Sequence, residues 1–227
     1  THLASSAASD VYKRQRDGDE WVINGEKWFA SHARFSEFLL VMVVTNPDVP
    51  IHEGASIILV EKGTPGMEIL RNSAVGPYVE QGDGVHAYIR FTNCRVPADN
   101  LLGEEGKGFL VAQTRLGGGR VHHAMRSVGV LKKAMDMMCE RVLSRTTKGE
   151  LLASKQMTQD KIADSYTQIL QYRLHVLYTA WLIDKYKEYN REVRKEIAAI
   201  KAATPKILQE VIYRAMHLHG SLGMSDE

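Results

Sequence analysis

Residue types that commonly carry chemistry are sparse in this sequence. His122 and His123 are adjacent, so on a helix their side chains point about 100° apart and do not converge on one metal ion. The two cysteines, Cys94 and Cys139, lie far apart, and the chain contains no Cys-x-x-Cys pair. We therefore interpret the two histidines as polar or interfacial side chains and predict no metal site.

The glycine-containing segments do not form a nucleotide-binding or nucleophile motif. The segment Gly103–Gly108 is only superficially similar to a phosphate-binding loop, because Lys107 is followed by glycine rather than Ser or Thr. No Gly-x-Gly-x-x-Gly segment follows a predicted strand, and no Gly-x-Ser-x-Gly elbow is present. These absences disfavour a Rossmann dinucleotide site and a hydrolase nucleophile.

Composition excludes further classes of function. The 227 residues are 44% hydrophobic and 25% charged, with a formal net charge of +2, which is typical of a globular domain. Basic residues are interspersed with acidic ones, so we expect no nucleic-acid partner. The longest apolar run, Phe38–Val44, is far shorter than the ~20 residues of a membrane helix, so we expect no membrane span. The N-terminus shows no signal-peptide pattern.

The chain changes character near residue 100. Five of the six prolines precede residue 98. Residues 1–100 carry 9 Lys or Arg and 13 Asp or Glu, whereas residues 101–227 carry 20 and 14. We predict an α+β protein: an atypical leader of a kind that a foreign sequence would give (1–15), a small β-barrel or sandwich domain (16–98) and an antiparallel α-helical bundle (99–227).

The first half has the pattern of short strands joined by turns. Asp17-Gly18-Asp19 indicates a turn, and Asn24-Gly25 predicts a type I′ hairpin because both residues tolerate positive φ. Residues 85–90 alternate between apolar and polar side chains, the period of a half-buried strand. The predicted strands are 21–23, 26–30, 39–45, 56–61, 67–70 and 85–91.

The second half has the pattern of long amphipathic helices, predicted over residues 108–144, 158–189 and 191–219. Gly220 is placed to end the last of these helices, and Pro205 predicts a kink or a first turn. The run Gly117–Gly119 disfavours a regular helix by about 1 kcal/mol per glycine. Helices of this length are expected to pack antiparallel.

Four segments form a series along the chain: Asp17–Ser31, Val96–Phe109, Arg145–Gln156 and His217–Gly223. In this order, across the change from strands to helices, they resemble the acyl-CoA dehydrogenase flavoprotein family over about residues 16–227. The family fold has an N-terminal helical domain, a middle β-barrel and a C-terminal four-helix bundle. The resemblance covers the middle domain and most of the bundle, so it implies that the chain is a fragment. The segment Gly119–Arg126 resembles the long members that act on unusual or hydroxylated fatty acyl chains.

The resemblance implies an enzyme that catalyses α,β-dehydrogenation of an acyl-CoA thioester with hydride transfer to N5 of FAD. FAD lies between barrel and bundle in the family, usually across a subunit interface. The catalytic carboxylate is expected beyond Glu227, so the fragment itself is expected to be inactive. Expected partners are an acyl-CoA substrate, electron-transfer flavoprotein as acceptor, and further copies in a homodimer or homotetramer. The expected location is the cytoplasm of a bacterium, or the mitochondrion of a eukaryote.

The resemblance also implies roles for individual residues. Phe29 matches an aromatic against the flavin, and Ser31 a hydroxyl near flavin N5, followed by His32 where many relatives carry Asn or Gly. Arg145 matches an arginine that reaches the FAD pyrophosphate of a neighbouring subunit. Arg120 matches an arginine near the acyl thioester. The remaining expected cofactor residues are Ser5, Ser6, Thr147, Gln156, His217, Gly220 and Ser221.

Other interpretations stay open at this point. A flavin enzyme of the same fold can instead pass electrons to oxygen, as an acyl-CoA oxidase does. A chain that lacks a base can also be a non-catalytic module that binds a nucleotide or another subunit. Structural roles are available for the candidate residues as well: a core aromatic for Phe29, a turn serine for Ser31, a helix-terminal cation for Arg145 and a helix cap for Gly220.

Overall fold

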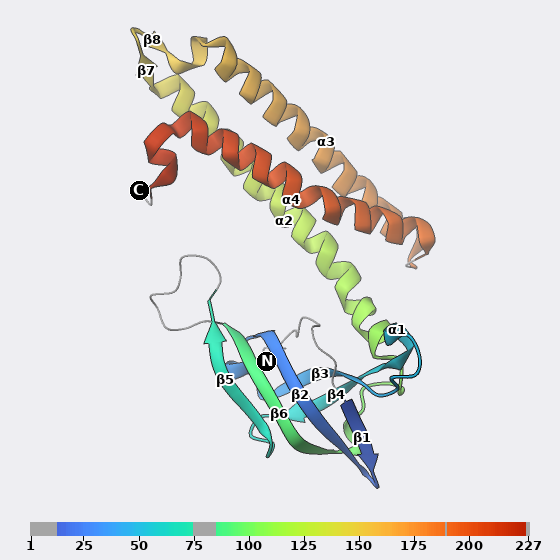
Figure 1. Ribbon diagram of the computed structural model, residues 1–227. Coiled ribbons are helices and arrows are strands. Elements are labelled where there is room, and N and C mark those ends of the chain that lie inside the picture. The colour runs from blue at the N-terminus through green and yellow to red at the C-terminus, as the bar shows by residue number, and fades with distance from the viewer. Residues whose placement is uncertain (1–12, 75–84, 189, 226–227) are drawn as a thin grey trace. The chain divides into compact units, whose positions relative to one another are not determined.

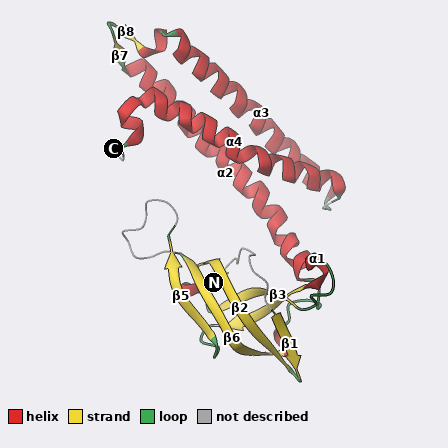
Figure 2. Cartoon of the chain, in the orientation of Figure 1, coloured by secondary structure: helices red, strands yellow, loops and turns green. Residues whose placement is uncertain are grey.

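The computed structural model describes residues 13–74, 85–188 and 190–225, and the chain divides into two compact units, Thr1–Thr114 and Arg115–Glu227 (Figure 1). Each unit is described here by itself. The expected cofactor residues Ser5 and Ser6, and most of the predicted leader, lie outside the described residues. Strands gather in the first unit and long helices in the second (Figure 2), which confirms the predicted α+β class.

The first unit is built on one six-stranded sheet, with a short helix α1 (Ile51–Gly54). Its strand order is β4-β3-β1-β2-β6-β5, and all neighbours are antiparallel except β1 and β3. Within the described residues the edge strands β4 and β5 do not pair with each other, so the barrel detail of the prediction stays unconfirmed. The strands are β1 (Lys13–Asp17), β2 (Glu20–Ser31), β3 (Phe38–Val44), β4 (Ala55–Glu61), β5 (Met67–Ser73) and β6 (His86–Pro97).

The predicted hairpin at Asn24-Gly25 is wrong. These residues lie inside β2, where the register against β6 shifts between Ile23 and Gly25. Gly25 has φ 133°, whereas Asn24 is not left-handed, so the pair cannot form a type I′ turn. Long pairing with β6 on both sides converts the local turn preference into a β-bulge. The chain reverses earlier, between β1 and β2, where Gly18 has φ 62°, as the Asp17–Asp19 turn predicted.

Alternation along the strands builds the core of the first unit. Trp21 and Ile23 of β2 are buried, as are Leu39, Val41 and Val43 of β3. The Trp21 indole Nε1 donates a hydrogen bond to the Ala98 carbonyl at 3.1 Å, which ties β2 to the segment after β6. The other large buried side chains of this core are Ile58, Val60, Ile89, Phe91 and Val96.

Cys94 lies fully buried in this core, and burial raises the pKa of its thiol from 9.0 to about 11. Below pH 9.0 the folded and unfolded chains both hold the proton, but between pH 9.0 and about 11 only the folded chain does. We therefore expect the free energy of unfolding to fall as pH rises through this window. The fall, measured by urea unfolding at about pH 8 and about pH 10.5, should be smaller in Cys94→Ala; equal falls in the two proteins would contradict it.

The second unit contains three long helices: α2 (Gly108–Ser144), which begins in the first unit, α3 (Gln156–Tyr186) and α4 (Arg191–His219). The predicted helix bounds are confirmed for α2 and α4, while α3 begins two residues earlier and ends three residues earlier than expected. Neither Gly117–Gly119 in α2 nor Pro205 in α4 ends its helix. Short connections reverse the chain twice, so consecutive helices run antiparallel (Figure 1).

The helices share one apolar core. Leu131 and Met138 of α2 are completely buried, and they belong to one cluster with Val176 of α3 and with Ile200 and Val211 of α4. A buried polar pair completes this core: the hydroxyl oxygens of Tyr172 and Thr204 lie 2.5 Å apart. No helix in the described part of the chain is both long enough and apolar enough to span a membrane.

Candidate functional site

A bend in β2 presents two aromatic rings at the surface of the first unit. The register of β2 against β6 shifts between Lys27 and Ala30, and Phe29 takes a left-handed backbone with φ 57°. Such a conformation is uncommon for a non-glycine residue. Trp28 and Phe29 are about 40% exposed, and their rings stack with centroids 5.0 Å apart at 10°. The bulge therefore turns outward two large rings that regular alternation would place on opposite faces of the strand.

A hydroxyl lies next to these rings. Ser31, at the end of β2, pairs with His86, the first residue of β6, and its Oγ lies 2.9 Å from the imidazole Nδ1. The Phe29 and His86 rings meet edge to face at 6.1 Å. His32 then takes φ 62°, the left-handed conformation that Asn and Gly favour, and begins a turn. Trp28, Phe29, Ser31 and His86 are called the aromatic corner from here on.

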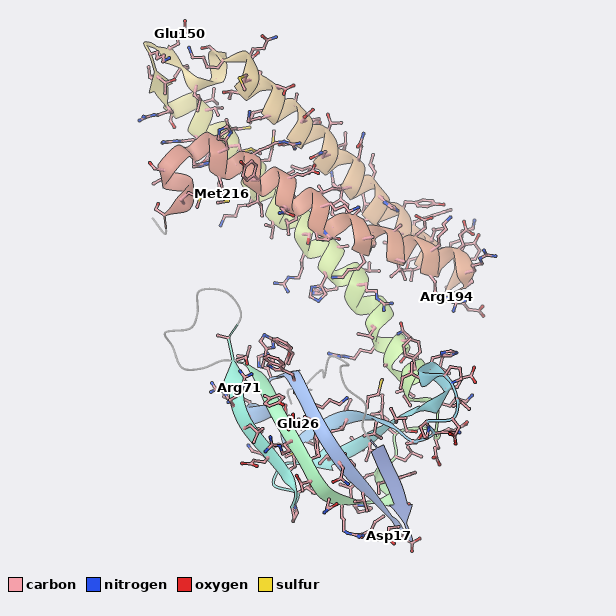
Figure 3. All side chains as sticks on the ribbon, viewed as in Figure 1. Asp17, Glu26, Arg71, Glu150, Arg194 and Met216 are labelled. Carbon is pink, nitrogen blue, oxygen red and sulfur yellow. The ribbon has the colours of Figure 1, made fainter. Side chains whose placement is uncertain are left out.

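Polar side chains from three neighbouring strands surround the corner. The Arg71 guanidinium of β5 lies over the Trp28 ring at 4.8 Å and donates to the Ser73 hydroxyl at 3.0 Å. The Trp28 indole Nε1 donates to the same hydroxyl at 3.2 Å. Glu26 of β2 accepts hydrogen bonds from Tyr88 and Arg90 of β6, which lower the pKa of its carboxyl. Glu26 and Arg71 are labelled in Figure 3. These contacts hold the Trp28 ring in place against the sheet.

A second group of predicted residues lies where α2 passes into α3. A two-residue hairpin joins β7 (Thr146–Thr147) to β8 (Glu150–Leu151), with Lys148 and Gly149 both at positive φ, as a type I′ turn requires. The Arg145 carbonyl accepts the Leu152 N–H at 2.7 Å, which closes the loop. The Arg145 side chain is exposed, Thr147 is half-buried, and Gln156 is the first residue of α3.

The C-terminal end of α4 supplies the remaining predicted residues. His217 is exposed and its ring is nearly parallel to that of Tyr213, Gly220 has φ 69° as the helix cap, and Ser221 follows in a 3₁₀ turn. Arg141 of α2 donates to the His219 carbonyl at 3.4 Å, so the ends of α2 and α4 lie together. Arg145, Thr147, Gln156, His217, Gly220 and Ser221 are called the bundle end from here on.

The structure thus divides the predicted site residues between the two units. Phe29 and Ser31 come together in the aromatic corner, and six others gather at the bundle end. Arg120 is half-buried on α2, in the second unit, and is not among the bundle-end residues. Among the described residues no three His, Cys, Asp or Glu side chains gather in a way that could hold a metal ion.

Sequence reasoning missed Trp28 and His86. The strand alternation around residues 85–90 placed His86 on a strand, but the pairing of Ser31 with His86 depends on a bulge that no local pattern predicts. Trp28 lies within the Asp17–Ser31 segment, but the apolar pattern did not distinguish it from a buried core residue. Two adjacent aromatic residues, separated from Ser31 only by Ala30, were the available signal.

Comparison with known proteins decides the family. The model of the acyl-CoA dehydrogenase C-terminal domain matches residues 106–227, and that of the middle domain matches residues 4–94. This chain belongs to the acyl-CoA dehydrogenase family. The middle-domain match begins inside the segment that the sequence analysis set apart as a leader. The predicted family and the order of its two domains are confirmed.

Relatives in this family align with nearly all of the chain. It is 42% identical to "Probable acyl-CoA dehydrogenase FadE2" of Mycobacterium tuberculosis, over 99% of this chain and 55% of that protein. It is 37% identical to human "Acyl-CoA dehydrogenase family member 11", over 99% of this chain and 29% of that protein. A solved structure of a putative acyl-CoA dehydrogenase from Mycobacterium abscessus matches with TM-score 0.84 and 35% identity, covering 95% of this chain and 53% of that one. The chain therefore spans about half, or less, of the length of these relatives.

Proposed function

We propose that these 227 residues are the cofactor-binding middle and C-terminal parts of an FAD-dependent acyl-CoA dehydrogenase that carries out α,β-dehydrogenation of an acyl-CoA thioester. The observation that carries the proposal is the aromatic corner. It combines an exposed ring at Phe29 with a neighbouring hydroxyl at Ser31, the two residue types that the family resemblance assigns to the flavin. Both lie in the part of the chain that matches the family's middle domain.

The residues of the corner fit a flavin. The parallel Trp28 and Phe29 rings offer a flat apolar surface, which suits a planar heteroaromatic ring system. The Ser31 hydroxyl can donate a hydrogen bond to a ring nitrogen or accept one from it. Contact with a bound ring would also remove the exposed part of Phe29 from water.

The bundle end fits the phosphate-bearing part of the same cofactor. Arg145 projects an exposed guanidinium, whose planar fork matches phosphate oxygens. Thr147 and Ser221 add hydroxyl donors, and Gln156 an amide. Gly220 has no side chain and a positive φ of 69°, which allows a ligand to approach the main chain closely. We assign these residues, with His217, to the pyrophosphate and nucleotide part of FAD.

Flavin, when bound, supplies the hydride acceptor for the β-hydrogen of the substrate. The role of this chain is to orient the reactants and to stabilise charge. The Phe29 ring excludes water from one side of the reacting centre, and the Ser31 hydroxyl stabilises negative charge that accumulates beside it. We assign Arg120 to the thioester end of the substrate. No residue of these 227 is assigned as the base that removes the α-proton.

We further propose that an acyl-CoA is the substrate, that electron-transfer flavoprotein accepts the electrons, and that the enzyme works as a homodimer or homotetramer. An apolar stripe on α3 supports self-association, because its side chains are exposed in the described part of the single chain. The stripe comprises Tyr166, Leu170, Leu174, Leu177, Tyr178 and Trp181. Burial of such a stripe between copies would stabilise an assembly.

The proposal is tested with a full-length protein that carries this sequence. We expect the purified protein to be yellow, to show flavin absorbance, and to lose that absorbance when an acyl-CoA is added without oxygen. Slow re-oxidation of the reduced protein in air is expected of a dehydrogenase, whereas fast re-oxidation would identify an oxidase. A folded protein that takes up no FAD would overturn the proposal.

A further inference from the structure

We propose that His86 is a positioning residue that orients the Ser31 hydroxyl toward the cofactor. This inference rests on the proposed function, because it concerns the residue there assigned to the flavin. The inference itself starts from one contact, the 2.9 Å separation of Ser31 Oγ and His86 Nδ1.

The backbone fixes the distance between these two side chains. Ser31 and His86 are directly paired residues of the antiparallel strands β2 and β6, so their side chains lie on the same face of the sheet. The next backbone group along, the His32 N–H, donates to the Val85 carbonyl at 2.5 Å and closes the end of the ladder. The two strands therefore hold the serine and the imidazole together without any contribution from a ligand.

The imidazole has an aromatic ring beside it, and the His86 backbone is paired on the side away from β2 as well. The Phe29 ring meets it edge to face at 6.1 Å. On the other side His86 pairs with Ser73 of β5, whose hydroxyl is engaged by Trp28 and Arg71. A free serine hydroxyl rotates among three staggered positions. For a given tautomer of His86, a hydrogen bond to this ring restricts the hydroxyl to fewer of them, which is the preorganisation that charge stabilisation requires.

Imidazole suits this position because its Nδ1 can either accept or donate. When Nδ1 accepts the Ser31 proton, Oγ presents its lone pairs to the neighbouring space. When Nδ1 carries a proton and donates, the Ser31 hydrogen is free to point there instead. The pair can therefore offer a ligand atom either an acceptor or a donor, whereas a carboxylate at this position could only accept. Reduction of a flavin changes N5 from a hydrogen-bond acceptor to a donor. The Ser31–His86 pair can therefore form a hydrogen bond with either state.

A double-mutant cycle on the flavin midpoint potential tests the inference, using the full-length holoprotein and dye equilibration rather than turnover. His86→Phe keeps a ring of similar shape without nitrogen, Ser31→Ala removes the hydroxyl, and a third protein carries both changes. We expect each single change to weaken binding of reduced flavin relative to oxidised flavin about tenfold, which lowers a two-electron potential by about 30 mV. Because His86 acts through Ser31, the double variant should show the shift of Ser31→Ala alone.

His86→Asn is the matched rescue variant, since its amide places a donor or acceptor near the Nδ1 position. We expect it to restore most of the midpoint potential that His86→Phe loses. Melting curves of the variants check that the first unit is folded. Additive shifts in the double variant, or an Asn variant that behaves like the Phe variant, would overturn the role of His86 while leaving the proposed function intact. Failure of the unaltered protein to take up FAD would overturn the proposed function and this inference with it.

Discussion

Replacement of Trp21 by alanine is expected to lower the free energy of unfolding of the first unit by about 3–5 kcal/mol. Trp21 is 2% exposed, so its removal leaves a large cavity among apolar side chains. The variant also lacks the hydrogen bond from the indole to the Ala98 carbonyl, so that acceptor loses this donor. Urea unfolding followed by circular dichroism measures the loss.

Trp28→Ala is the matched comparison. The two indoles lie seven residues apart on the same strand, but Trp28 is 40% exposed. We expect Trp28→Ala to lower the free energy of unfolding by less than half as much, because a partly exposed ring leaves no closed cavity. Equal losses in the two variants would show that the assigned burial of β2 is wrong.

Replacement of Arg145 by alanine is expected to weaken FAD binding by about 10- to 100-fold, the range that corresponds to losing a charge-assisted hydrogen bond to phosphate. Arg145 is exposed and its carbonyl, rather than its side chain, closes the loop to Leu152. The melting temperature of the cofactor-free protein should therefore change little. The dissociation constant is measured by titrating the cofactor-free, full-length protein with FAD and following flavin fluorescence.

Two further variants make this result specific. Arg145→Lys keeps the charge but loses the planar fork, so we expect an intermediate affinity. Arg194→Ala removes another exposed arginine, from the first turn of α4 (Figure 3), whereas the bundle-end residues of α4 lie at its last turn and just after it. Arg194→Ala should leave FAD affinity unchanged. If it weakens binding as much as Arg145→Ala does, the effect is one of overall charge and the assignment to phosphate fails.

The helices were predictable because each depends on a pattern that repeats along its own sequence. Apolar residues at helical spacing placed α2 and α4 at their observed bounds, and Gly220 ended α4 as a cap with positive φ. Asn24-Gly25 shows the opposite case. The pair carries a strong turn signal, yet β6, some seventy residues away, recruits both flanks of the pair into one strand. Long-range pairing of this kind overrides a local preference and leaves no local trace.

In the candidate site, too, some features follow from local sequence and others from long-range pairing. Phe29 and Ser31 were identified from a motif that is contiguous in the sequence, and the structure places them together. His86 lies 55 residues away and reaches Ser31 only through the register of β2 and β6, which depends on two bulges. The bundle end likewise joins the ends of α2 and α4 through Arg141, a residue that no motif singled out. Sequence patterns therefore identified candidate site residues, while the pairing of strands and helices showed which other residues contact them.

The backbone at Phe29 also restricts which amino acids can occupy that position before any ligand is considered. At φ 57°, side chains that branch at Cβ crowd the main chain, so Val, Ile and Thr should be poorly tolerated there even though they are good strand residues elsewhere. Asn and Gly relieve this crowding but provide no ring. In a saturation library sorted first for folded protein and then for retained flavin, position 29 should pass the first sort with small, amide and aromatic side chains but not with Val, Ile or Thr. Only the aromatic side chains should then pass the second sort.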